Sequence, residues 1–176
     1  PRPRRNPVAE RLKARVPRWY RPVFHYLGNM AIAGVAVALI SWRASSIEHF
    51  RVWTLLAFVP ALVFSNGLEY VMHRYPMHHR TKLLDRWFKR HTLMHHRFFD
   101  QFTLAVRSRF EAYYVMTNGH TTALSIAIVL GLYLGLGLSI GVDVASVVAL
   151  SLKLYSAYVE TMHILFHCPG SWMRLP

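Results

Sequence analysis

Apolar residues along this chain are concentrated in four long runs, at residues 23–42, 52–72, 121–140 and 142–166. A helix needs about 20 apolar residues to cross the roughly 30 Å of hydrocarbon in a bilayer, and each run approaches or exceeds that length. Gly141 alone separates the third run from the fourth. The pattern therefore predicts four transmembrane helices, with the last two joined in a tight hairpin.

Residues 82–99, between the second and third runs, mix bulky apolar side chains with positive charges. The apolar members are Leu83, Leu84, Trp87, Phe88, Leu93, Met94, Phe98 and Phe99. The basic members are Lys82, Arg86, Lys89, Arg90 and Arg97. A helix with a basic side and an apolar side is typical of segments that lie in the membrane interface. We expect such an interfacial helix here.

The distribution of charge predicts an orientation. The chain is 53% hydrophobic, yet its formal net charge is +13. Eight Lys or Arg residues lie in residues 1–22 and nine in residues 73–120, whereas the link between the first two runs holds Arg43 and Arg51. Because Lys and Arg collect on the cytoplasmic side of membrane proteins, both termini and residues 73–120 are expected in the cytoplasm. Attraction to anionic lipid explains the charge, so nucleic acid is not an expected partner.

Residues 1–22 are expected to form a basic cytoplasmic segment that precedes a membrane domain at residues 23–176. Prolines in this segment oppose regular structure, and they are Pro1, Pro3, Pro7, Pro17 and Pro22. The run at 23–42 has the full length of a span and aromatic residues at its edges. It is therefore expected to be a membrane anchor and not a cleaved signal peptide.

Polar residues inside the apolar runs fall on single helix faces. In the fourth run they are Lys153, Ser156, Glu160, His163 and His167, and near the end of the second they are Asn66, Glu69 and His73. A charge in mid-bilayer is costly, so these faces are expected to look into the bundle or a wet cavity. Glu69 and Glu160 each lie one turn from a histidine, which they would orient or assist in binding a metal. Alternatively, they pair with nearby Arg or Lys.

Seven of the eleven histidines form three clusters where apolar runs meet basic sequence: His73 with His78, His91 with His95 and His96, and His163 with His167. Imidazole is the commonest side-chain ligand of borderline transition metals. Each cluster taken alone would also suit interfacial cations or helix caps, but three at one membrane face favour a metal centre. The predicted fold is thus an all-α membrane protein, with four transmembrane helices and a cytosolic histidine-rich cap.

Spacing suggests how the clusters would share ions. His91 and His95 are four residues apart and would lie on one face of an α-helix, while His96 is turned by about 100° and would reach a second ion. His73 and His78 would diverge on one continuous helix. Pro76 predicts a break just before it on steric grounds, which would let the two rings converge from separate segments.

Three strings resemble the successive histidine boxes of the fatty acid hydroxylase superfamily, whose members are also called sterol desaturases: EYVMHRYPMHH, HTLMHHRFFD and ETMHILFH. The resemblance covers residues 52–176 and is strongest to bacterial members and to fatty acid 2-hydroxylases. It implies a dimetal centre facing the cytosol, in a bacterial inner membrane, that uses O2 and electrons from a redox protein to hydroxylate or desaturate a lipid C–H bond. Carried over residue by residue, the implied ligands are His73, His78, His91, His95, His96, His163 and His167.

The chain departs from the family pattern in three places. His91 is separated by three residues from the paired histidines, where the pattern allows two or three, and His79 is an extra histidine that would replace a ligand or orient one. The family has a further HxxHH box beyond the counterpart of His167, and the printed sequence ends at Pro176. We therefore expect this chain to load metal incompletely and to be inactive as it stands. His25, His49 and His120 lie in no box and are expected to be ordinary interfacial residues.

The type of ligand limits which metal ions are expected, and two other functions would use histidines differently. An imidazole-rich site with open positions suits two iron ions, and zinc would occupy the same ligands without redox chemistry. A b-type haem electron carrier would place single histidines on facing helices within the bilayer. A metal transporter would need polar ligands near the midplane, where the sequence offers Lys153 and Ser156.

Overall fold

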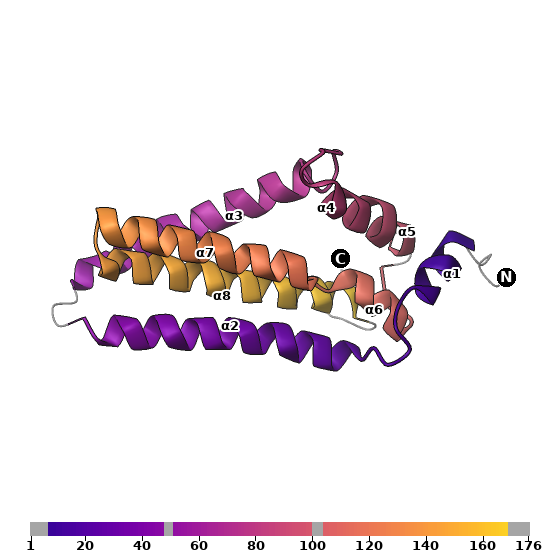
Figure 1. The fold of residues 1–176 in the computed structure, drawn as a ribbon, viewed down its shortest axis with the longest axis horizontal. Coiled ribbons are helices and arrows are strands. Elements are labelled where there is room, and N and C mark those ends of the chain that lie inside the picture. Colours follow the sequence, from indigo (N-terminus) through magenta and orange to yellow (C-terminus); the bar gives the residue numbers. More distant parts are fainter. Residues whose placement is uncertain (1–6, 48–50, 100–103, 169–176) are drawn as a thin grey trace. The chain divides into compact units, whose positions relative to one another are not determined.

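The computed structural model describes residues 7–47, 51–99 and 104–168, which form helices and turns without a strand (Figure 1). Four stretches are long and apolar enough to cross a membrane: Pro22–Ser45, Val52–Arg74, Arg109–Ser139 and Val142–His167. The four-span prediction is confirmed, and the third stretch begins before the run read from sequence. The helices are α1 Pro7–Ala14, α2 Pro22–Ser45, η1 Val52–Ala57, α3 Phe58–Arg74, α4 Asp85–Arg90, η2 His91–His95, α5 His96–Phe98, α6 Arg109–Val115, α7 Gly119–Ser139 and α8 Val142–His167.

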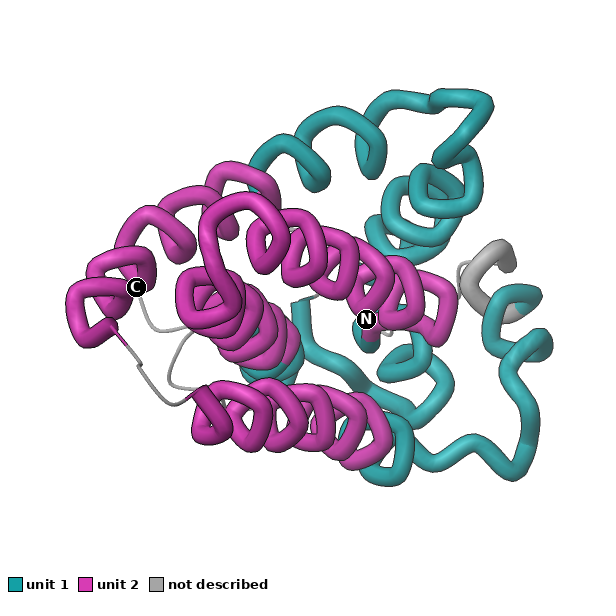
Figure 2. The backbone as a smooth tube through the Cα atoms, turned by 60° about the vertical axis from the view of Figure 1, so that its left-hand side comes forward, with its two compact units in different colours: residues 1–26, 70–116, 161–176 teal, residues 27–69, 117–160 magenta. Residues whose placement is uncertain are grey.

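The chain divides into two compact units, coloured separately in Figure 2. Unit 1 consists of residues 1–26, 70–116 and 161–176, and unit 2 consists of residues 27–69 and 117–160. Unit 2 therefore contains most of the apolar length of the four spans. Unit 1 contains the three histidine clusters.

Helices α7 and α8 form the hairpin that the sequence predicts, and they share the core of unit 2. Val129 packs there against Ala149 and Leu152, with Ile40 of α2 at the edge. Gly141 makes the turn with a φ of 137°, a backbone conformation that side chains disfavour. The tight connection is thus possible because a glycine occupies it.

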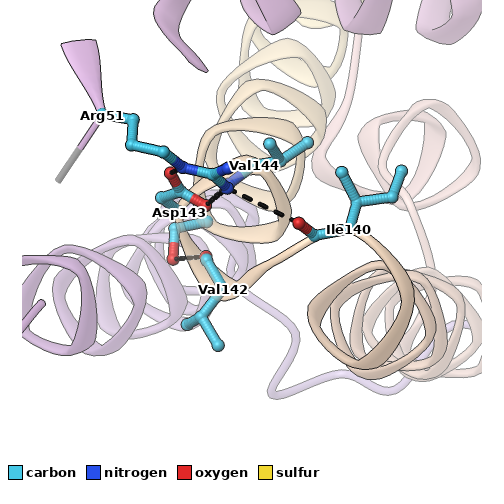
Figure 3. A network of polar contacts seen from close by, with 6 residues as sticks. Arg51, Ile140, Val142, Asp143 and Val144 are labelled. Carbon is cyan, nitrogen blue, oxygen red and sulfur yellow. Dashed lines mark hydrogen bonds and ion pairs between the residues drawn. The ribbon is translucent and has the colours of Figure 1, made fainter. Parts of the chain in front are cut away.

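An ion pair lies beside this turn in unit 2 (Figure 3). The guanidinium of Arg51 donates two hydrogen bonds of 2.6 Å to the carboxylate of Asp143, and it also lies over the ring of Trp53. Bidentate geometry fixes both partners more firmly than a single contact would. The pair joins the start of the second span to the start of α8.

Polar residues of the spans contact one another inside unit 2. Glu160 accepts hydrogen bonds from the Asn29 side chain at 3.2 Å and from the backbone N–H of Thr117 at 3.1 Å. Lys153 is 4% exposed and lies 3.5 Å from the hydroxyl of Ser125. These contacts satisfy polar groups that would otherwise be costly among apolar helices. The expectation that this face of α8 looks into the bundle is supported for Lys153 and Glu160.

A helix forms in part of the N-terminal segment, so the prediction that prolines oppose regular structure there is wrong for residues 7–14, whereas residues 15–21 contain turns and no helix. Pro7 begins α1, a position where its missing N–H removes no helical hydrogen bond. Leu12, Val16 and Tyr20 are buried with Tyr114 in the core of unit 1. The hydroxyl of Tyr114 also donates to the Leu12 carbonyl at 2.8 Å. Burial of these side chains stabilises the segment within unit 1.

Helix α6 is held at both ends within unit 1. Ser108 caps its start by accepting from the Glu111 N–H, and the Glu111 carboxylate accepts from the Arg107 N–H at 2.7 Å and pairs with Lys13. At its end, Arg90 donates to the carbonyls of Tyr113 and Met116. Arg90 directly precedes His91, so it ties the histidine-bearing helix to α6.

Candidate metal centre

The first histidine cluster is brought together by the predicted chain break. Helix α3 ends at Arg74, and residues 75–79 form a turn that contains Pro76. The Nε2 atoms of His73 and His78 consequently approach to 3.2 Å. The convergence predicted from Pro76 is confirmed.

The second cluster lies on a π-helical turn, η2, which the sequence pattern did not indicate. The N–H of His96 bonds to the carbonyl of His91, five residues earlier, which is the π-helical pattern. On an ideal α-helix these residues would be turned by about 140° from each other. Here their Nε2 atoms lie 3.2 Å apart. The extra residue in the turn puts His91 and His96 on one side.

Two groups of imidazoles result. His73, His78 and His91 present ligand atoms within 4.8 Å of one another, and His96 adjoins them through His91 and His78. We call these four residues the exposed group. His95, His163 and His167 also present ligand atoms within 4.8 Å of one another, and we call them the buried group. The expected pairing of His91 with His95 on one ion differs from this arrangement, which separates them.

Backbone carbonyls orient two rings of the buried group. Nδ1 of His95 lies 3.2 Å from the carbonyl oxygen of Tyr114, and Nδ1 of His167 lies 2.7 Å from that of Leu104. A carbonyl only accepts hydrogen bonds, so each Nδ1 must carry the proton. Nε2 is then the unprotonated nitrogen in both rings, and its lone pair is available to a metal.

Three rings outside the apolar spans have lowered pKa values, which favours the neutral form that metal binding requires, and they belong to His91, His95 and His96. Burial, together with the nearby rings of His163 and His167, lowers the pKa of His95 from 6.5 to about 2. Burial likewise lowers the pKa of His91 to about 3, with His73 as the largest neighbouring cause. The pKa of His96 is also lowered by burial, although a hydrogen bond with the Phe99 backbone acts in the opposite direction.

The spacing fits metal coordination. With metal–nitrogen bonds of 2.0–2.1 Å, adjacent ligands of a tetrahedral ion lie about 3.3 Å apart. The two Nε2 contacts of 3.2 Å in the exposed group match this value. The two groups are neighbours, because the rings of His91 and His95 stack with centroids 5.3 Å apart. The arrangement can therefore accommodate two ions side by side.

The other predicted residues lie apart from these contacts. His79 donates through Nδ1 to the Arg74 carbonyl at 3.0 Å, and Glu160 bonds with Asn29 and Thr117 as described above. Glu69 is half-buried on α3. The metal-orienting roles expected of these three remain predictions.

Histidines outside the boxes have other surroundings. His25 contacts the hydroxyl of Tyr20 at 2.8 Å, and His120 is exposed at the start of α7. His49 and the expected C-terminal box lie outside the described residues. Sequence reasoning missed the carbonyls of Tyr114 and Leu104, because every residue has a carbonyl and only the fold selects which one meets a ring.

Comparisons of the chain with models of protein families, with curated proteins and with solved structures found no match.

Proposed function

We propose that this protein is a membrane-bound dimetal oxygenase that hydroxylates or desaturates a lipid C–H bond. The observation that carries the proposal is the pair of adjoining imidazole groups in a helical protein with four apolar spans. Seven imidazoles are more than one structural or hydrolytic zinc ion uses. Two ions bound by nitrogen ligands with open positions are suited to O2 chemistry.

The residues of this chain would hold and shield the ions. The exposed group would bind one and the buried group the other, with iron supplying the capacity to activate O2 when bound. Tyr114 and Leu104 orient two of the rings, which keeps Nε2 aimed at the ion. Burial of His95 and His167, at 6% and 3% exposure, keeps water from that part of the centre.

A lipid is the substrate class that best fits the surroundings. His73, His163 and His167 stand at the ends of two predominantly apolar spans, so a hydrocarbon chain in the bilayer would approach the centre without entering water. Electrons would come from a redox protein. The seventeen basic residues of residues 1–22 and 73–120 support a cytoplasmic location for the centre, in a bacterial inner membrane.

Two other functions are less well supported. A b-type haem needs imidazoles on opposite faces of a flat macrocycle, whereas Nε2 of His73 and His78 are 3.2 Å apart with further rings beside them. A transporter would need metal ligands along a path through the bilayer. Lys153, a cation that lies near Ser125, is a poor candidate for such a ligand.

Elemental analysis tests the metal content. A form of the protein extended past residue 176, purified in detergent without chelator, should contain close to two metal ions per chain, iron in preference to zinc. His95→Ala should lower the content, whereas His120→Ala should leave it unchanged. Metal at background level in the unsubstituted protein would refute the dimetal assignment.

Lipid profiling tests the reaction. Cells that produce the form extended past residue 176 together with an electron donor should contain a lipid that has gained one oxygen or lost two hydrogens, and cells producing its His95→Ala variant should lack it. Metal at two per chain with no altered lipid, in extracts that cover fatty acids, sphingolipids, sterols and carotenoids, would argue against lipid oxidation while leaving the metal centre intact.

A further inference from the structure

The two histidine groups differ in their access to solvent. In the buried group, His95 and His167 are among the most buried polar residues of the described chain, at 6% and 3% exposure. In the exposed group, His73, His78 and His96 are exposed and His91 is half-buried. An ion held by the exposed group would therefore meet water and chelators more readily.

The groups also differ in how their rings are fixed. Two of the three rings in the buried group donate to backbone carbonyls, and α8 is joined to the Leu104 segment by a second bond from the Val106 N–H to the His167 carbonyl at 2.8 Å. In the exposed group one ring of four, that of His96, bonds with the backbone, at Phe99, and the other close polar contacts run from ring to ring, between His73 and His78 and between His91 and His96. Ring-to-ring contacts of this kind must be given up when Nε2 binds a metal.

The backbone segments that carry the rings are also more firmly held in the buried group than in the exposed group. His163 and His167 project from the last turns of the 26-residue helix α8, while His78 stands on the turn at residues 75–79. A turn has fewer hydrogen bonds to restrain it than a long helix, so it opens at lower cost. Rings that are already oriented lose less conformational freedom on binding and hold a metal more tightly.

We infer that the two metal positions are unequal: the buried group binds the first ion tightly, and the exposed group binds a second, exchangeable ion. This inference rests on the proposed dimetal function and adds an order of loading to it. The buried ion would be a permanent part of the protein. The exposed position would govern how much of the protein is complete at a given metal supply.

Cobalt titration tests the order of loading. The form extended past residue 176, free of metal and in detergent, is titrated with Co²⁺, and visible absorption and bound cobalt are followed together. We expect two phases that differ at least tenfold in affinity, the first of one equivalent. His163→Gln should remove the tight phase and His73→Gln the weak phase, with His120→Gln as the control that retains both.

Chelator release from the unsubstituted protein gives an independent measurement that needs no variant. Dialysis against rising chelator should remove one equivalent before the other. Release of both ions together, or loss of the tight phase in His73→Gln but not in His163→Gln, would overturn the inference and leave two bound metals. Absence of cobalt binding would overturn both the inference and the proposed dimetal centre.

Discussion

At the scale of single residues, the carbonyls of Tyr114 and Leu104 decide which nitrogen of two imidazoles is available. Neutral imidazole has one donor and one acceptor nitrogen, and a carbonyl partner assigns the donor. No particular residue type is required at positions 104 and 114, because the hydrogen-bond acceptors are backbone atoms. The carbonyl partner nevertheless determines that Nε2 is the nitrogen that His95 and His167 can offer to a metal.

The lowered pKa values of His91 and His95 predict a dependence on pH. Both rings have a pKa of 6.5 when unperturbed and about 3 or 2 in the fold, so below pH 6.5 an opened state binds protons that the folded state does not. Stability therefore falls as pH drops from about 6.5 towards 3 and is unaffected by these groups above 7. Hydrogen exchange at residues 85–98 of metal-free protein, corrected for intrinsic rates, should accelerate over that range.

The reference for this measurement is α7, which contains no histidine after His120. Its exchange at residues 125–139 should change little between pH 7 and 5. Equal acceleration in both segments would point to general unfolding and contradict an effect of the two buried rings.

At the scale of elements, the π turn η2 sorts three neighbouring histidines between two groups. A regular α-helix would keep His91 beside His95, whereas the π turn places His91 beside His96 and leaves His95 to the buried group. Such turns arise from one extra residue and occur often at functional sites. Arg90 and its bonds to the end of α6 hold the helix that contains this turn.

Deletion of Leu93 should abolish this assignment of the histidines to two groups. Leu93 is 41% exposed, so its loss removes little buried surface, but it returns the segment to the α-helical count and turns the later histidines by about 100°. We expect the loss of both metal ions in elemental analysis. Leu93→Ala keeps the count and should keep the metal; retention of two ions by the deletion variant would contradict the role of the π turn.

At the scale of the whole molecule, charge is distributed unevenly along the chain, with seventeen basic residues in residues 1–22 and 73–120 against two in the link between the first two spans. From the positive-inside rule we propose that the histidine-rich segment lies in the cytoplasm. Proline in the N-terminal segment does not prevent α1 from packing, so that segment belongs to unit 1.

Cysteine labelling of intact cells should verify this orientation. In a Cys168→Ser background, Ser45→Cys is expected to react with a membrane-impermeant reagent from the outside, and Thr81→Cys only after lysis. Both positions are exposed in the structure, whereas Ala112 is buried and would react poorly on either side. The reverse pattern would invert the topology and move the candidate centre out of the cytoplasm.

The sequence by itself determined the four spans, the hairpin and the break before Pro76. Apolar length, a glycine between two runs and the steric demand of proline act over a few neighbouring residues, so their effects can be read without knowing the fold. The same locality explains why all seven clustered histidines could be selected as candidates.

Only the tertiary structure decided how those histidines are grouped and oriented. The π turn was not indicated by the sequence pattern, and the carbonyls of Tyr114 and Leu104 and the packing of Leu12 and Val16 depend on partners far away in the chain. A pattern that extends over a few neighbouring residues does not contain such contacts. The local sequence specifies which residues can be metal ligands, whereas tertiary packing assigns those residues to two metal positions.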